Sequence, residues 1–487
     1  MRRTDLALAA IAALAGCGSG CDGERAQKST APKPPDVGAT SEAGAVVQEA
    51  PEDAGALPVT IGFLDAPGGT LDNLFTGLAA AEKNEPGGRV DLLFFGDSHT
   101  AGDSMTSRLR QIWQHEFGDA GRGVVGAGRV PTRHYYQRDV HYGISGDWKA
   151  AVGGKRGDSE PFGIAGMRVF GQRKGAQLWV ETCAECPAGH STSQFEILYY
   201  AAPDHGILRY RVDEGTWQQL PTKTTAIEPP HPARQVVPVP DGPHRLTLEH
   251  GGGGALDLFG VVLERGRDGV IVDSLGVVGR RLGSLRSWDW SIIGEQLSTR
   301  DPRLVVLQYG TNEADDPDLN LDDLARYYDE TILRIRAAAP QASILILGPP
   351  DMGVREGGRA CDHMKKPKLD AGVVPECEWR TPAILGEIIS VEHAAAVRNH
   401  VAFFDTFAAM GGADHMDGWV NADPKVAYKD RVHFTDVGYQ RWADALTGAL
   451  LEQYNRWREA QHLPPSRPIA VPAARPTDAP LPGPIAP

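Results

Sequence analysis

Residues 90–100 read Val-Asp-Leu-Leu-Phe-Phe-Gly-Asp-Ser-His-Thr. The first six predict a buried strand, and the residues that follow predict a turn into a helix. A strand that ends in this way presents the Ser98 hydroxyl at the carboxyl edge of a sheet, where open α/β sheets bind their ligands. A serine in this place can act as a nucleophile if a base reaches it.

A candidate base lies far downstream, in the stretch Asp430-Arg431-Val432-His433, which precedes a helical pattern from residue 437. An imidazole titrates near neutral pH, so His433 is suited to take the proton of Ser98 and return it to a leaving alcohol. Asp430 would hold the imidazole in one tautomer and stabilise its protonated form. These three residues are the predicted catalytic residues.

Two further segments follow predicted strands and carry hydrogen-bond donors. Residues 274–281 follow the strand 270–272, and Tyr309-Gly310-Thr311-Asn312-Glu313 follows the strand 304–308. The backbone N–H groups of Ser98 and Gly279 and the side chain of Asn312 would bind the oxyanion of an ester's tetrahedral intermediate. Gly276 is a rival to Gly279 for this role.

Each segment also has a plain structural interpretation. Ser98 could cap the next helix, Asn312 could be a turn residue, and Asp430 with His433 could form a surface pair. The four segments together, each at the end of a predicted strand, favour ester hydrolysis. We expect His99 to pack against its neighbours and assign it no catalytic role. Trp288 and Trp290 could stack on sugar rings or pack in the core.

The four segments, in this order, resemble the SGNH (GDSL-type) hydrolase family. Glu313 departs from the pattern, because many members have aspartate there. The resemblance implies a three-layer, flavodoxin-like α/β fold that works without a cofactor or metal. Residues 96–100, 117–123 and 310–314 also resemble bacterial peptidoglycan O-acetylesterases. That subgroup implies an acetylated polysaccharide as substrate and an inserted β domain resembling a carbohydrate-binding module.

The order of predicted elements agrees with an interrupted α/β domain. Helices are predicted at 71–81, 104–116, 321–338 and 382–400, and strands at 343–347 and 401–404. Between residues 147 and 268, short runs broken by glycine and proline predict a β-sandwich. We expect this sandwich to resemble a jelly roll. Its strands are expected at 177–181, 195–201, 208–213, 233–239, 244–249 and 256–264. The predicted organisation is a signal peptide (1–17), a disordered tether (18–57), a first hydrolase segment (58–146), the β insert (147–268), a second hydrolase segment (269–462) and a proline-rich disordered tail (463–487).

The start of the chain predicts export. Arg2 and Arg3 precede a short apolar run that ends in Leu14-Ala15-Gly16-Cys17, a pattern that resembles the bacterial lipobox. The resemblance implies cleavage before Cys17 and its acylation, so we expect a membrane-anchored lipoprotein of the cell envelope. An ordinary signal peptide is the alternative.

Charge and cysteines limit the other possibilities. The formal net charge of −14 disfavours a nucleic-acid partner. Cys183 and Cys186 are expected to form a local disulfide, and Cys361 and Cys377 a second one. A single Cys-x-x-Cys without a close histidine pair disfavours zinc. We expect a monomer.

The primary functional hypothesis is a serine esterase that removes O-acetyl groups from a polysaccharide such as peptidoglycan. A polysaccharide O-acetyltransferase with the same residues is an alternative, because only the acceptor of the acyl group differs. A non-catalytic glycan-binding lipoprotein and a lipase are further alternatives.

Overall fold

The computed structural model describes residues 62–130, 135–154, 160–356 and 378–466. The predicted signal peptide, Cys17, the tether, the tail from residue 467 on, Cys361 and Cys377 lie outside these residues and stay predictions. Within the described residues, every helix is too short or too polar to cross a bilayer.

Five parallel strands form the centre of the α/β fold: β2 (Arg89–Gly96), β14 (Gly269–Gly276), β15 (Leu304–Gln308), β16 (Ser343–Leu347) and β19 (Ala402–Phe404). Their order across the sheet is β19-β16-β15-β2-β14, the flavodoxin-like order. The short strand β1 (Leu64–Asp65) adds an antiparallel edge next to β19. The sheet is therefore mostly parallel, with one antiparallel edge.

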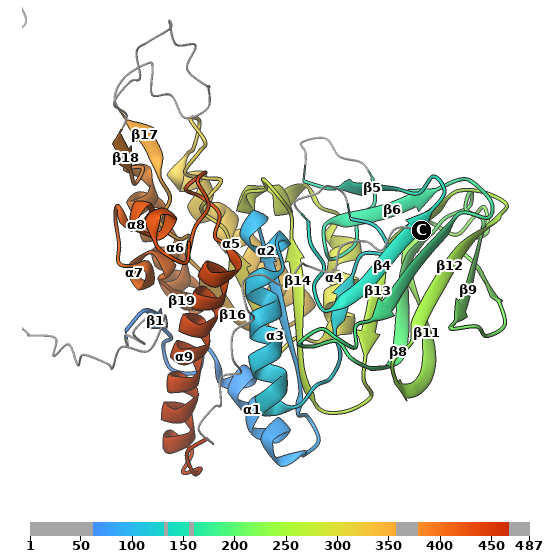
Figure 1. Ribbon diagram of the computed structural model, residues 1–487, viewed down its shortest axis with the longest axis horizontal. Coiled ribbons are helices and arrows are strands. Elements are labelled where there is room, and N and C mark those ends of the chain that lie inside the picture. The colour runs from blue at the N-terminus through green and yellow to red at the C-terminus, as the bar shows by residue number, and fades with distance from the viewer. Residues whose placement is uncertain (1–61, 131–134, 155–159, 357–377, 467–487) are drawn as a thin grey trace, which may run out of the picture. The chain divides into compact units, whose positions relative to one another are not determined.

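Helices cover both faces of this sheet (Figure 1). The helices α1 (Asp72–Lys83), α3 (Ser104–Phe117) and α9 (Asp436–Ala460) share a core with Leu92 and Phe94. The helices α4 (Trp290–Arg300), α5 (Leu321–Ala338) and α6 (Ile384–Asn399) share the opposite core with Leu93 and Phe95. Successive strand residues point to opposite faces, so a continuous apolar run supplies both cores.

Shorter elements connect these layers. They are α2 (Ser98–Ala101), the 3₁₀ helix η1 (Leu282–Ser287), β17 (Val354–Glu356), β18 (Glu378–Arg380), α7 (Thr406–Met410) and α8 (His415–Asn421). Two of them, α2 and η1, follow β2 and β14 directly and lie at the carboxyl edge of the sheet.

The stretch between α3 and β14 folds into two antiparallel sheets around a common apolar core. One contains β10 (Gln218–Pro221), β9 (Ile207–Val212), β12 (Arg245–Gly252), β7 (Gln177–Thr182) and β4 (Val140–Ser145). The other contains β11 (His231–Gly242), β8 (Thr192–Ala201), β13 (Leu256–Glu264), β6 (Met167–Gly171) and β5 (Lys149–Val152), with β3 (Gly123–Val125) paired to β13.

Antiparallel pairing begins before the predicted start of the insert at residue 147. Both β3 and β4 lie upstream of that boundary and belong to these two sheets. Their partners, β13 and β7, follow much later in the chain, so local sequence alone does not reveal the pairing. The domain boundaries and the jelly-roll description stay predictions.

A disulfide joins Cys183 and Cys186, whose Cα atoms are 5.3 Å apart. Beside it, His141 Nε2 lies 2.7 Å from a carboxylate oxygen of Glu185. His141, Cys183 and Glu185 together bring three atoms of the kinds that coordinate metals close to one another. The Cys183 sulfur is already consumed by the disulfide, so this group carries no argument for a metal.

Candidate active site

Ser98 stands at the first position of α2, directly after the central strand β2. Asp97 caps this helix, because its Oδ1 accepts the N–H of His99 at 2.9 Å. The turn is tight enough that a Cβ at Gly96 would clash with the Thr100 hydroxyl. Thr100 in turn donates to Gln308 on β15 at 2.9 Å. These contacts hold α2 against the sheet and direct Ser98 toward the open edge.

The structure brings Ser98, His433 and Asp430 together. His433 Nε2 lies 2.9 Å from Ser98 Oγ, although the two residues are 335 positions apart. His433 Nδ1 lies 2.8 Å from Asp430 Oδ2. The imidazole therefore bridges the hydroxyl and the carboxylate, the arrangement by which a serine nucleophile is activated.

Asp430 also shapes the loop that carries His433, which lies between α8 and α9 and not at the end of a strand as predicted. Its Oδ1 accepts the backbone N–H groups of Val432 at 3.1 Å and His433 at 3.0 Å. Arg431, which directly follows Asp430, has a positive φ of 57°. Its guanidinium binds Asp417 at 2.6 Å and lies 3.9 Å from the ring centre of Trp379. One carboxylate thus fixes both the loop backbone and the orientation of the imidazole.

The two rival glycines have different surroundings. A Cβ at Gly276 would clash with the backbone of α2 at Ala101 and Asp97, so this glycine allows β14 and α2 to approach closely. Gly279 lies in a turn closed by Arg280 N–H donating to Val277 O at 3.1 Å, with φ of 70°. A Cβ there would meet nothing within 4 Å. Gly279 faces the cavity at Ser98, and this placement favours it over Gly276 as an oxyanion donor.

Asn312 lines the same cavity as Gly279. Its Nδ2 donates to Arg280 O at 3.1 Å and approaches Asp97 Oδ2 at 3.3 Å. The backbone carbonyl of Asn312 accepts a hydrogen bond from Arg281 Nε at 3.0 Å. Glu313 is buried, and its carboxylate accepts the N–H groups of Leu282 and Gly310 at 2.7 and 2.9 Å. Both loops that supply predicted oxyanion donors are therefore tied to each other.

Comparison with known proteins agrees with this geometry. Residues 242–441 match the model of the GDSL-like lipase/acylhydrolase family. A solved peptidoglycan O-acetylesterase superposes with a TM-score of 0.62 at 24% identity, covering 81% of this chain and 100% of its own. Residues 242–441 are thus similar to GDSL-type acylhydrolases, and the superposition shows a shared fold.

Two further solved structures are only weakly similar to this chain. An acetyl xylan esterase has a TM-score of 0.26 at 17% identity, covering 37% of this chain and 80% of its own. A family two carbohydrate esterase from Clostridium thermocellum has a TM-score of 0.26 at 11% identity, covering 63% of this chain and 99% of its own. No curated protein sequence matches the chain.

The family match contains Gly279, Asn312, Asp430 and His433 but begins after Ser98. The antiparallel sheets separate β2 from β14 in the sequence, and the two strands are nevertheless adjacent and parallel in the sheet. Residues of β14 and β2 pair in register from Gly269 with Arg89 to Gly276 with Gly96. The fold thus brings Ser98 to the matched region of the hydrolase.

A cavity of about 630 Å³ opens at Ser98 and His433. Its wall includes residues that the sequence analysis did not identify: Tyr136, Arg138, Tyr428 and Asp436. Arg138 and Asp436 form an ion pair at 2.8 Å. These residues come from three separate segments, and no motif or spacing connects them. The proximity of Tyr428 to Asp430 in the sequence was the one available signal.

Burial shifts the pKa values of Asp97 and His99, which lie behind Ser98. Burial and the charge of Glu313 raise the pKa of Asp97 to about 7, against the opposing hydrogen bond from His99 N–H. Burial, assisted by the charge of His433, lowers the pKa of His99 well below 6.5. The neutral His99 ring contacts Tyr439 Oη through Nδ1 at 3.0 Å and packs 5.4 Å from the His433 ring. His99 therefore supports the imidazole by packing, as its neighbouring position suggested.

The tryptophans near the site divide between the two possibilities left open. Trp288 is buried in the core and does not line the cavity at Ser98. Trp290 is half-buried, and its Nε1 donates to Leu285 O at 2.8 Å. Stacking of Trp288 on a sugar is therefore excluded by its burial.

Proposed function

We propose that the hydrolase removes acetyl or other short acyl groups from a polysaccharide such as peptidoglycan through an acyl-enzyme on Ser98. The observation that carries the proposal is the bridge made by His433, 2.9 Å from Ser98 Oγ and 2.8 Å from Asp430. A hydroxyl, an imidazole and a carboxylate in this order are the groups that ester cleavage by a serine requires.

The proposed reaction proceeds in two halves. Ser98 Oγ attacks the ester carbonyl while its proton passes to His433 Nε2, and the carbonyl oxygen becomes an oxyanion near Gly279 and Asn312. The intermediate collapses, the bond to the sugar oxygen breaks, and that oxygen takes the proton from Nε2. A water molecule then repeats the attack on the acyl-enzyme, which releases the carboxylic acid and restores Ser98.

The lining of the cavity and the similarity to a solved peptidoglycan O-acetylesterase support this choice of substrate. Polar and aromatic side chains line the cavity, among them Tyr136, Arg138 and Tyr428. A long acyl chain would need an apolar channel, whereas hydroxyl-rich glycans suit such walls. The similar solved structure is a peptidoglycan O-acetylesterase. The inserted β region, which we propose to be jelly-roll-like and glycan-binding, is consistent with a polymeric substrate.

The test is acetate release from a panel of acetylated glycans, including acetylated peptidoglycan and xylan, by the native protein and by Ser98→Ala. We expect release by the native protein alone. Equal release by both would reject Ser98 as the nucleophile, and faster cleavage of long-chain acyl esters would indicate a lipase. Acetyl transfer to an added glycan acceptor in place of release would instead identify an acyltransferase.

We expect Asn312→Ala to lower kcat by about 100-fold to 1000-fold, because one oxyanion donor is worth about 2.7–4 kcal/mol of the barrier. Steady-state kinetics with 4-nitrophenyl acetate would measure the loss. Asn455→Ala is a control with the same chemical change, since Asn455 is exposed on α9 and lies outside this cavity. Equal losses in both variants would contradict the oxyanion role.

The pH dependence of kcat/KM should report His433. Burial lowers the pKa of this imidazole, but the hydrogen bond and charge of Asp430, with the charge of Asp97, outweigh burial and raise the pKa above 6.5. The base must be neutral, so activity should fall as pH decreases through a midpoint above 6.5. His99 stays neutral across this range. A midpoint below 6.5 would contradict the assignment.

We also propose that acylation of Cys17 anchors the hydrolase to a membrane of the cell envelope, where exported polysaccharides are accessible. The Leu-Ala-Gly-Cys sequence at residues 14–17 supports this proposal. Metabolic labelling with a radioactive fatty acid should mark the native chain and leave Cys17→Ser unlabelled. Equal labelling of both would remove Cys17 as the acylated residue.

A further inference from the structure

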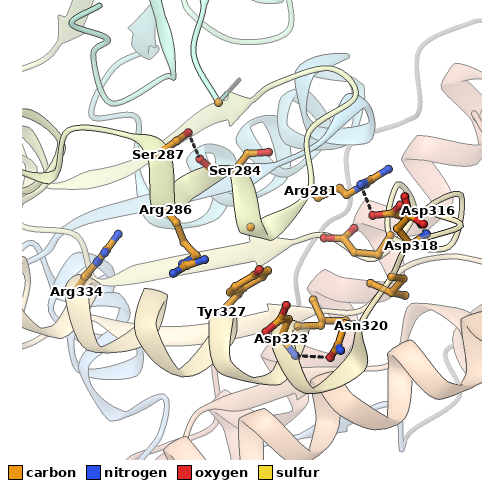
Figure 2. A pocket seen from close by; sticks show the side chains of 15 residues that line it. Arg281, Ser284, Arg286, Ser287, Asp316, Asp318, Asn320, Asp323, Tyr327 and Arg334 are labelled. Atoms are coloured by element: carbon orange, nitrogen blue, oxygen red, sulfur yellow. Dashed lines mark hydrogen bonds and ion pairs between the residues drawn. The ribbon is translucent and has the colours of Figure 1, made fainter. Parts of the chain in front are cut away.

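A second large cavity lies beside the active site. Its volume is about 660 Å³, close to the 630 Å³ of the cavity at Ser98. Its lining comes from η1 on one side and from the start of α5, with the loop before it, on the other (Figure 2). The proposed mechanism uses none of the side chains that project into it.

One side chain separates the two cavities. Arg281 lines the second cavity, and its Nε donates to the backbone oxygen of Asn312, which lines the first. The same guanidinium pairs with Asp316 (Figure 2). A molecule that extends from Ser98 past Asn312 would therefore meet Arg281 and then the second cavity.

Hydrogen-bond donors and acceptors face one another across this cavity. Arg286 and Arg334 lie toward one end, and Asp316 and Asp323 toward the other, with Tyr327 between them (Figure 2). Sugar hydroxyls both donate and accept, so they can bind arginine and aspartate side chains at once. The ring of Tyr327 adds an apolar surface for the C–H groups of a pyranose.

The position of Tyr327 depends on a glycine and on arginines. A Cβ at Gly283 would lie 2.9 Å from the Tyr327 ring, so the absence of a side chain there allows the ring to approach η1. The guanidinium carbon of Arg286 lies 4.6 Å from the centre of this ring. Arg334 lies 5.4 Å from the ring centre of Trp290. Planar side chains held in this way need little ordering when a ligand binds.

The charges argue against a simple anion site. Arg281 pairs with Asp316, and Arg286 pairs with Glu330 at 2.8 Å. Two of the three lining arginines are thus already neutralised, Asp323 pairs with Arg326 at 2.5 Å, and Asp318 adds negative charge to the wall. A free phosphate would meet these carboxylates, whereas a neutral polyhydroxylated chain would find partners in both signs of charge.

We propose that this second cavity is a subsite for neighbouring sugar residues of the glycan strand whose ester is cleaved at Ser98. The proposal rests on the proposed function, because it extends the same substrate. It assigns Arg286, Arg334 and Tyr327 to substrate binding and names the substrate as an oligosaccharide chain, not a single acetylated sugar.

The test compares chain lengths. The probes are O-acetylated N-acetylglucosamine and its β-1,4-linked O-acetylated dimer and tetramer, with acetate release measured for the native protein and for the double variant Arg286→Ala/Arg334→Ala. For the native protein we expect kcat/KM to rise at least about tenfold from monomer to tetramer, mostly through KM, since the longer chain makes additional polar contacts in the second cavity. The double variant should lose this rise.

A matched control is Arg398→Ala/Arg456→Ala, which removes two exposed arginines that are each paired with one carboxylate and lie outside both large cavities. This control should keep the native dependence on chain length, and thermal unfolding would verify that both double variants fold. A native protein indifferent to chain length, or a double variant that retains the full rise, would overturn the subsite. Equal acetate release by the native protein and Ser98→Ala would instead reject the proposed function, so the two failures are distinguishable.

Discussion

Replacing Ser98 by alanine is expected to reduce kcat with 4-nitrophenyl acetate by about 10⁴-fold or more, because the acyl-enzyme cannot form. The hydroxyl lies 2.9 Å from His433 Nε2. Removing it leaves the cavity, the oxyanion donors and the loops in place, so the fold should persist. Initial rates at saturating ester, compared with the native protein, would measure the effect.

Two controls sharpen this expectation. His433→Ala should cost about as much as Ser98→Ala, and the double variant should be no worse than either, since residues that act as one unit are strongly non-additive. A fluorophosphonate probe should label the native protein and leave Ser98→Ala unlabelled. Labelling that persists in Ser98→Ala would place the reactive serine elsewhere.

Asp430→Asn is expected to lower kcat by about 10⁴-fold while the loop keeps its shape. The amide can still accept the N–H groups of Val432 and His433 through Oδ1, as the carboxylate does. Its NH₂ group would face His433 Nδ1, which would then have to accept a hydrogen bond. The proton would move to Nε2, directed at Ser98, and the imidazole could no longer take the serine proton.

The pH profile gives this variant a second readout. The charge and hydrogen bond of Asp430 raise the pKa of His433, so their loss should move the acid limb of the residual activity to lower pH. Asp329→Asn is a matched control, because Asp329 is a surface carboxylate bound by Arg398 and Asn399 away from the site. A native-like rate in Asp430→Asn would show that the carboxylate is dispensable.

Elements with a strong local pattern were predicted closely. Helix α5 (Leu321–Ala338) and the strands β16 (Ser343–Leu347) and β15 (Leu304–Gln308) begin and end where the sequence analysis placed them. A strand of a parallel sheet is buried on both faces, so its apolar run is continuous and its ends are sharp. The long helix shows an apolar stripe at helical spacing, which is equally local.

Elements defined by distant partners were missed or displaced. The edge strand β1 has two residues, and only its pairing with β19 defines it. Strands β3 and β4 precede the predicted insert, and each pairs with a strand later in the chain. Short antiparallel strands depend on cross-strand packing more than on intrinsic preference, so the sequence carries a weaker signal for them.

By itself, the sequence determined which side chains follow the buried strands, among them Ser98 and Asn312, and it identified His433 as a candidate base. The physical reason is local, since an apolar run followed by a turn ends a strand and places the next side chains at the sheet edge. Only the tertiary structure decided that Ser98 and His433 meet, that Gly276 packs against α2 while Gly279 faces the cavity, and that Arg281 separates two cavities. Those contacts depend on strand order and on the close packing of distant segments, which no local pattern encodes.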